Sequence, residues 1–305
     1  MMLPSLFLRL LQYNGAMNEK FPIPQAERLV GNFEDFNSDF YDDSFSRKKE
    51  SEEKGEVISD PVEVLRRTFE EYSTSSLETE LEKTEREIEI IKIAAEAVKN
   101  IATEYGRENF IELTDDHIHL FPDGGVEELT NGRLAIGSHS TVLGEAFVDR
   151  RDDLATAITT FHELWHTLAS YNAIQVKKDG ELDWYRSGFS ILSRDGKTKM
   201  FHHLDEALVG YATKRFVNEV LRQRPDFTTE IELEEGEVDS TRQRELTDFL
   251  EYLDVVLERN EGEFSDTEEI LDLFMKAQVT GNILPVARLI EKTFGKGSFR
   301  KLSEF

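Results

Sequence analysis

The segment 161–166, Phe-His-Glu-Leu-Trp-His, constrains the fold of this chain more than any other, because it places two imidazoles and a carboxylate on an apolar helix. The surrounding pattern predicts that this helix runs over residues 149–171. Its apolar positions are typical of a core helix: Leu154, Ile158, Phe161, Trp165 and Leu168. Because buried polar groups without partners are costly, the fold must bring partners to His162, Glu163 and His166.

The spacing of these residues is that of an HExxH sequence, which suits a metal ion. Residues four apart share one face of an α-helix, so His162 and His166 can present imidazole nitrogens to a single ion. Glu163 stands beside them, placed to take a proton from a metal-bound water. Zinc suits two imidazoles plus a carboxylate and lowers the pKa of its water toward about 7. A chance match is expected only about 0.02 times in such a chain; two ordinary core histidines are the alternative.

The composition excludes several kinds of catalytic or metal site and several classes of binding partner. The chain has no cysteine, which excludes disulfides and thiol nucleophiles. A metal ion must therefore be bound by histidine and carboxylate side chains. Its 62 acidic and 36 basic residues give a net charge of -26, which argues against nucleic-acid and membrane-surface partners. No apolar run approaches the roughly 18 residues of a membrane span, and residues 1–17 are too weak for a secretory signal, so a cytoplasmic location is predicted. Nothing in the pattern indicates an oligomeric state.

The domain organisation is predicted from changes in composition and in residue pattern along the chain. Residues 1–59 combine high charge with scattered aromatics, which is typical of a disordered acidic tail; a segment that docks on a partner is the alternative. Residues 60–305 are predicted to form one domain. Its elements fall into four groups: helices over 60–106, a sheet and the HExxH helix over 107–172, a hairpin and second helix over 173–224, and helices over 241–305. This segregation predicts an α+β fold, with a small mixed sheet over the HExxH helix and a mostly helical C-terminal part.

Local patterns predict the bounds of the helices. A first helix is expected over 60–72, and a second is expected from 75–78 to about 105–106. The apolar face of the second favours packing on the core over a short coiled coil. A further helix is expected over 204–222. The acidic stretch 226–240 is interpreted as a solvated connection, with gating of a cleft as the alternative.

Alternating apolar residues predict four short strands, over 110–113, 117–120, 134–136 and 146–148. Residues 184–192 are expected to form one arm of a hairpin, whose turn lies at 194–197.

A third metal ligand is expected downstream, as a carboxylate or a histidine. The best candidate segment is 204–211, LDEALVGY, in which Glu206 stands 40 residues after His166. With HExxH, this segment resembles the gluzincin branch of the zinc metallopeptidases, in which a second helix carries a ligand glutamate. The stretch 185–189, YRSGF, followed by LDEA, is similar to a pattern in uncharacterised bacterial proteins of this kind. The resemblance covers about residues 120–305.

The resemblance implies a zincin-like fold and zinc-dependent hydrolysis of peptide bonds in peptide or protein substrates. By it, His162, His166 and Glu206 bind zinc. Glu163 is the general base that deprotonates the attacking water and then protonates the leaving amine. An extended peptide is expected to pair with an edge strand near 133–148.

Gluzincins often stabilise the oxyanion with a histidine or a tyrosine, and the candidates here are His203, Tyr211 and Tyr185. His202 or His203 could instead replace Glu206 as the third ligand.

One position departs from the family pattern. Many gluzincins carry an acidic residue one turn beyond the ligand glutamate, where it supports a zinc histidine; here that position is Gly210. Asp205, another carboxylate or a backbone carbonyl must take over this support. The departure favours an alternative function, a zinc-stabilised but catalytically inactive protein-interaction module. The intact Glu163 argues against that alternative, because a purely structural site needs no base.

No role in the proposed metal site is predicted for the remaining histidines. His117 and His119 are predicted to share one strand face as a surface pair, with a second metal site as the alternative. His139 lies in a Gly/Ser-rich stretch and is expected to be ordinary.

Overall fold

The computed structural model describes residues 27–30, 79–110, 117–130, 135–141, 144–176, 182–193, 198–234 and 240–304. The chain divides into two compact units. The first comprises residues 1–78, 141–143 and 172–186, and the second comprises residues 79–140, 144–171 and 187–305. The helix expected over 60–72 lies outside the described residues, as does the expected tail apart from Glu27–Val30.

The first unit contributes strands in the order β1-β5-β6: β1 (Glu27–Val30), β5 (Asn172–Val176) and β6 (Leu182–Ser187, whose last residue belongs to the second unit). β1 pairs antiparallel with β5. A paired strand at Glu27–Val30 differs from the expected detached tail, because the backbone of β5 gives this stretch hydrogen-bond partners. The domain expected over 60–305 includes residues of both units.

The second unit holds a mixed three-stranded sheet among its described residues, in the order β2-β4-β3. β2 (Ile118–Phe121) runs parallel to β4 (Glu145–Asp149), and β3 (Gly137–Ser140) runs antiparallel to it. β2 and β4 lie where alternation predicts strands. The strand expected over 134–136 is wrong: the chain pairs over the polar residues of β3 instead, and Ile136 precedes them. The expected strand over 110–113 lies outside the described residues except for Phe110, which is not in a strand.

The long helix α5 (Glu85–Glu104) begins later than the expected 75–78 because of its cap. The hydroxyl of Thr84 accepts from the backbone N–H of Glu87 at 3.2 Å, and the Glu87 carboxylate accepts from Thr84 N at 2.7 Å. This capping box fixes the first turn. The helix packs its apolar face against α7 (Asp153–Leu164), so core packing rather than a coiled coil is confirmed.

The HExxH segment lies on α7, which also starts later than expected. Asp149 ends β4, and its carboxylate accepts from the backbone N–H groups of Gly124 and Val126 at the start of the short helix α6 (Gly125–Leu129). Asp149 is therefore unable to open α7. Asp152 caps it instead, accepting from Ala155 N at 2.7 Å.

Beyond Leu164 the helix widens into one π-helical turn, η3 (Trp165–Ala169), in which Ser170 N donates to Trp165 O at 3.0 Å. His166 lies on this turn, whereas His162 lies on regular α-helix. Such π-turns are rare and occur frequently at functional sites.

The expected hairpin arm over 184–192 is two strands rather than one, because Gly188 turns the chain with a φ of +54° between β6 and β7 (Ser190–Leu192). β7 pairs antiparallel with β8 (Lys199–Met200), and the expected turn at 194–197 lies outside the described residues.

The rest of the second unit is helical. α8 (His202–Glu219) is the second helix expected over 204–222, and the 3-10 turn η4 (Leu221–Gln223) follows it. The stretch expected as an acidic connection is helical from its start as α9 (Pro225–Glu234), because proline suits the first helical position. The C-terminal elements are α10 (Ser240–Arg259), α11 (Thr267–Thr280), α12 (Leu284–Phe294), α13 (Ser298–Lys301) and η5 (Leu302–Glu304).

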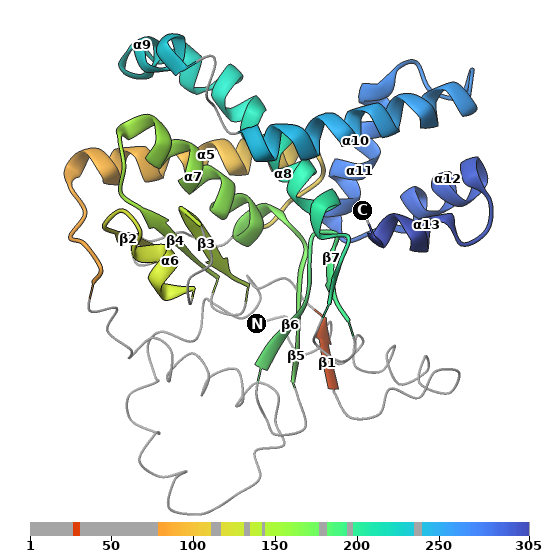
Figure 1. Ribbon diagram of the computed structural model, residues 1–305, viewed down its shortest axis with the longest axis horizontal. Coiled ribbons are helices and arrows are strands. Elements are labelled where there is room, and N and C mark those ends of the chain that lie inside the picture. The colour runs from red at the N-terminus through yellow and green to blue at the C-terminus, as the bar shows by residue number, and fades with distance from the viewer. Residues whose placement is uncertain are drawn as a thin grey trace, which may run out of the picture. The chain divides into compact units, whose positions relative to one another are not determined.

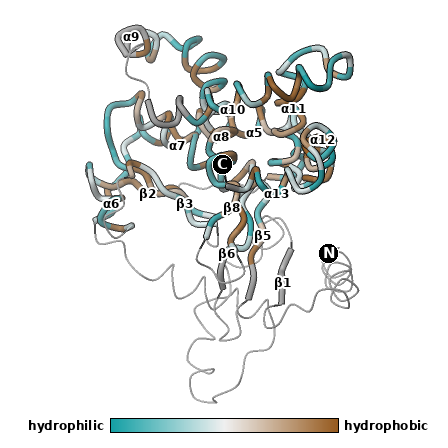
Figure 2. Tube along the Cα trace, turned by 45° about the vertical axis from the view of Figure 1, so that its right-hand side comes forward, coloured by the Kyte–Doolittle hydropathy of each residue, from teal (hydrophilic) through white to brown (hydrophobic). Residues whose placement is uncertain are grey.

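The core of the second unit forms where α7 packs against α5, α8 and β4, with α7 lying over the sheet (Figure 1). Hydrophobic stretches of α5, α7 and α8 come together there (Figure 2). The rings of Phe161 on α7 and Phe216 on α8 stack with their centroids 4.4 Å apart, which ties the two helices together. Within the described ranges, no helix is both long and apolar enough to cross a membrane. The second unit confirms an α+β architecture with a largely helical C-terminal part.

Candidate metal centre

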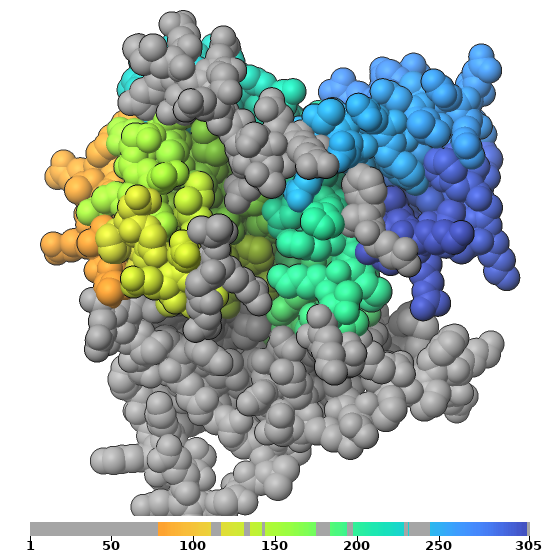
Figure 3. Space-filling model, in the orientation of Figure 1, coloured from red at the N-terminus to blue at the C-terminus, as the bar shows by residue number. Residues whose placement is uncertain are grey.

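Three side chains from the HExxH segment and α8 converge. The Nε2 atoms of His162 and His166 lie 3.3 Å apart. His162 Nε2 is 3.3 Å from Glu206 Oε2, and His166 Nε2 is 3.4 Å from Glu206 Oε1. The imidazoles are buried, with 2% and 3% of their side chains exposed, whereas Glu206 is 18% exposed. On the face drawn in Figure 3, the yellow to light-green atoms of the sheet and α7 border the green atoms of α8.

These separations suit one metal ion. Ligands about 2.1 Å from a tetrahedral ion lie about 3.4 Å from one another. Two imidazole nitrogens and a carboxylate match the donors that zinc accepts. The sequence-predicted residues His162, His166 and Glu206 are therefore brought together in an arrangement that can bind a metal.

A second carboxylate stands on the other side of His166. Asp205 is 1% exposed, and its Oδ2 lies 3.7 Å from His166 Nδ1. Its Oδ1 accepts from Phe189 N and from Gln278 Nε2, both at 2.8 Å. The buried amide of Gln278 also accepts from Trp165 Nε1 at 3.1 Å, so α11 fixes Asp205. Asp205 thus brings a carboxylate to the Nδ1 side of His166, whereas Gly210 has no side chain to do so.

The electrostatics of the cluster favour positive charge between the carboxylates. Burial alone would lower the pKa of His166, but Glu206 and Asp205 outweigh it and raise this pKa to about 9. Burial opposes the ionised form of Glu206, yet the two imidazoles hold its pKa well below the usual range. Asp205 behaves differently, because burial dominates and raises its pKa to about 6. A bound cation would take the place of the positive charge that His166 otherwise carries as a proton.

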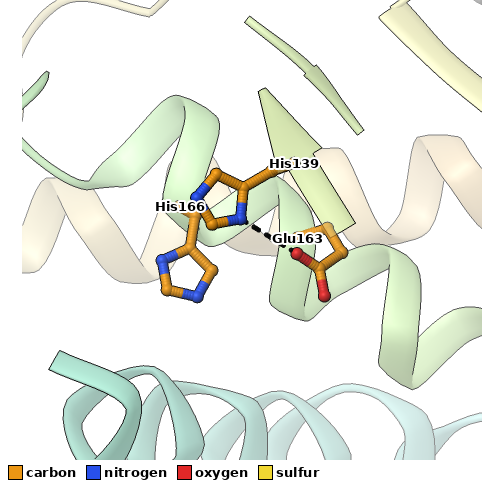
Figure 4. A group of neighbouring side chains, drawn as sticks. All are labelled: His139, Glu163 and His166. Carbon is orange, nitrogen blue, oxygen red and sulfur yellow. Dashed lines mark hydrogen bonds and ion pairs between the residues drawn. The ribbon is translucent and has the colours of Figure 1, made fainter. Parts of the chain in front are cut away.

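His139, expected to be ordinary, belongs to the cluster. Its Nδ1 lies 3.1 Å from Glu163 Oε2, and its ring stacks on that of His166 with centroids 4.2 Å apart (Figure 4). Burial would raise the pKa of Glu163, but the hydrogen bond from His139 and the nearby imidazoles lower it. Because an ionised carboxylate only accepts hydrogen bonds, His139 Nδ1 donates here. The one sequence signal that could have indicated this residue is its spacing from Gly137, because residues two apart share one face of a strand.

Of the three proposed oxyanion stabilisers, the structure brings neither Tyr211 nor His203 to the cluster. The Tyr211 hydroxyl donates to Glu268 at 3.4 Å, and His203 pairs with Glu245 at 2.9 Å with 60% of its side chain exposed. The positions of Tyr211 and His203 on α8 direct their side chains away from the cluster, toward α11 and α10 respectively. His202 stays nearer, with its Nδ1 3.7 Å from Glu206 Oε1. Tyr185 lies on β6, in the first unit.

The predicted surface pair of His117 and His119 does not form. His117 is 4% exposed and precedes β2 in a 3-10 turn, so the two do not share a strand face. His119 bonds to Glu80 at 3.0 Å.

Replacing Gly188 with alanine should destabilise the protein more than the matched change at Gly262. Both glycines have positive φ, 54° and 83°, so each substitution costs about 1 kcal/mol or more in backbone strain. An added Cβ at 262 meets nothing within 4 Å, whereas one at 188 overlaps Asp205 and Gln278. Disrupting that buried hydrogen-bond network adds about 1–3 kcal/mol. Urea denaturation of both variants measures the difference, and equal losses would show that Asp205 is not tightly held.

The sequence matches no family model, and no curated protein or solved structure matches it. Function must therefore be inferred from the geometry of the described residues.

Proposed function

We propose that this chain is a zinc-dependent metallopeptidase of the zincin-like, gluzincin kind, in which His162, His166 and Glu206 hold the metal. The observation that carries the proposal is the convergence of two Nε2 atoms and one carboxylate at separations of 3.3–3.4 Å. Glu163 lies beside this group on the same helix, with 4% of its side chain exposed. A structural zinc site is normally closed by four protein ligands, and this group offers three.

When bound, zinc supplies a Lewis acid that lowers the pKa of a water and polarises a carbonyl. The chain's own residues do the rest. Glu163, kept ionised at neutral pH, accepts a proton from the attacking water at its carboxylate and returns it to the leaving amine. Asp205 places its carboxylate 3.7 Å from His166 Nδ1, and this charge favours the orientation in which Nε2 faces the metal.

The substrate proposed is an extended peptide. Among the described strands of its sheet, β3 has a neighbour on one side only, so its other edge offers backbone donors and acceptors. His139 of β3 reaches Glu163, so a peptide added at this edge would run close to the base. The alternative, a catalytically inactive zinc module, rested mainly on Gly210; Asp205, whose Oδ2 lies 3.7 Å from His166 Nδ1, offers a carboxylate on that side of the histidine and supports the peptidase instead.

Metal removal tests the proposal directly. Wild-type protein purified without chelator should carry about one zinc per chain by mass spectrometry, and it should cleave fluorescently labelled casein. Treatment with 1,10-phenanthroline should abolish the cleavage, and added Zn²⁺ should restore it. Mg²⁺, which prefers oxygen ligands, serves as the control and should not restore it. A metal-free wild type, or cleavage that survives chelation, would contradict the proposal.

A further inference from the structure

The Glu163 carboxylate is held from outside its own helix. Of the two oxygens, Oε2 accepts from His139 Nδ1 at 3.1 Å. Figure 4 shows His139 pointing from β3 toward Glu163, with the ring of His166 close by. The donor thus comes from the sheet and reaches a side chain that, on the helix alone, could adopt other rotamers.

A glycine lets β3 approach closely enough for this contact. A Cβ added at Gly137 would lie 2.5 Å from Thr159 Cγ2 and 2.7 Å from Glu163 Oε1. Both distances are shorter than real Cβ contacts, so a larger residue here would have to displace the side chains of Thr159 and Glu163. Gly137 and His139 are two residues apart on β3 and therefore share the face that meets α7. The glycine and the histidine are independent indications that β3 is fitted against Glu163.

The same imidazole also contacts the proposed metal ligand. The rings of His139 and His166 stack with centroids 4.2 Å apart and an interplanar angle of 16°. Glu163 and His166 are three residues apart, so one side chain bridges neighbouring positions on the helix surface. His139 thereby fixes the base and the ligand relative to each other.

We infer that His139 is a positioning residue, which uses its Nδ1 hydrogen bond to hold the Glu163 carboxylate beside the metal. The inference rests on the proposed function. Productive geometry requires the base to be held tightly, and partners of this kind typically contribute 10–100-fold to activity. His139 could instead be a ligand of a second ion with Glu163 and His166, because these three also form a group that can hold a metal.

Two substitutions at this position form a matched pair. His139→Asn keeps a nitrogen donor on Cγ, near the place of Nδ1, whereas His139→Gln moves the donor one atom further out. Both remove the ring stacking, so only the hydrogen bond distinguishes them. With labelled casein as the probe, His139→Gln should lower kcat by about 10-fold or more at unchanged KM and zinc content, and His139→Asn should retain most of the activity. Equal loss in both variants would overturn the inference, as would two zinc ions per wild-type chain or zinc loss in the variants.

An imidazole ¹H–¹⁵N spectrum supplies a readout that needs no substrate. Wild-type protein should show a slowly exchanging Nδ1 proton on His139, and its signal should shift in Glu163→Gln. Absence of this proton, or indifference to the substitution, would overturn the inference. If the wild type lacks zinc and does not cleave casein, the proposed function fails. The spectrum then still decides whether His139 holds Glu163.

Discussion

Glu163→Gln should reduce casein hydrolysis by about 10²–10⁴-fold while leaving zinc content near that of the wild type. The amide keeps the shape of the carboxylate but does not accept the proton of the attacking water. Glu163 is absent from the three residues proposed to hold the metal, so its substitution leaves the donor set unchanged. Steady-state kinetics together with mass-spectrometric metal analysis separate the two effects.

Glu245→Gln is the matched control for this change. Glu245, with 24% of its side chain exposed, also pairs with a histidine, at 2.9 Å from His203, but it lies outside the cluster. The control should keep wild-type activity. If Glu163→Gln retained both its zinc and the wild-type rate of cleavage, Glu163 would not be the base, and any cleavage would come from a contaminant. An inactive wild type with zinc retained would favour the interaction module.

Much of the second unit could be predicted because its helices carry long apolar patterns. The HExxH helix, the long helix before the sheet and the helix of Glu206 all lie near their expected places. Their ends could not be predicted, because they depend on side chains that choose between competing partners. Asp149 illustrates this: it resembles a helix cap in sequence but binds the backbone at the start of α6. The capping box of Thr84 and Glu87 likewise displaced the start of α5.

Residue spacing alone predicted the centre only where its residues share one helix. HExxH places His162, Glu163 and His166 by spacing alone. His139 comes from a strand with little apolar pattern, and its role depends on how closely Gly137 lets that strand approach. Gln278, which holds Asp205 from α11, stands 73 residues from it in sequence and is part of no local motif. Such partners are set by the packing of helices, which periodicity does not specify.

Among the three proposed metal ligands, Glu206 was the least predictable, for the same reason. On α8 the buried apolar positions include Leu204 and Leu208, and Glu206 stands about 200° from Leu204 at 100° per residue. That angle alone would direct it to solvent. The approach of α7, fixed partly by the stacking of Phe161 on Phe216, instead brings both imidazoles to its carboxylate. The position is therefore a property of the pair of helices rather than of α8.

Glu206→Gln should weaken zinc binding by about 100-fold or more while the fold is retained, since loss of a direct ligand exceeds the 10–100-fold cost of losing an outer partner. The amide is nearly isosteric but is a poor zinc ligand, and it leaves the imidazoles without their counter-charge. Competition with a chromogenic chelator measures the affinity, and circular dichroism checks the fold. His162→Ala should lose zinc as well.

His202→Ala and His203→Ala are the decisive controls, because each histidine precedes Glu206 on α8 and is an alternative third ligand. His202 is 41% exposed and lies 3.7 Å from Glu206, and His203 is bound to Glu245, so neither change should alter zinc affinity by more than a few-fold. Full affinity in Glu206→Gln, combined with loss in either histidine variant, would show a three-histidine site. The carboxylate would then be the partner of a ligand rather than a ligand itself, and Asp205 and Glu206 would flank the metal histidines as outer supports.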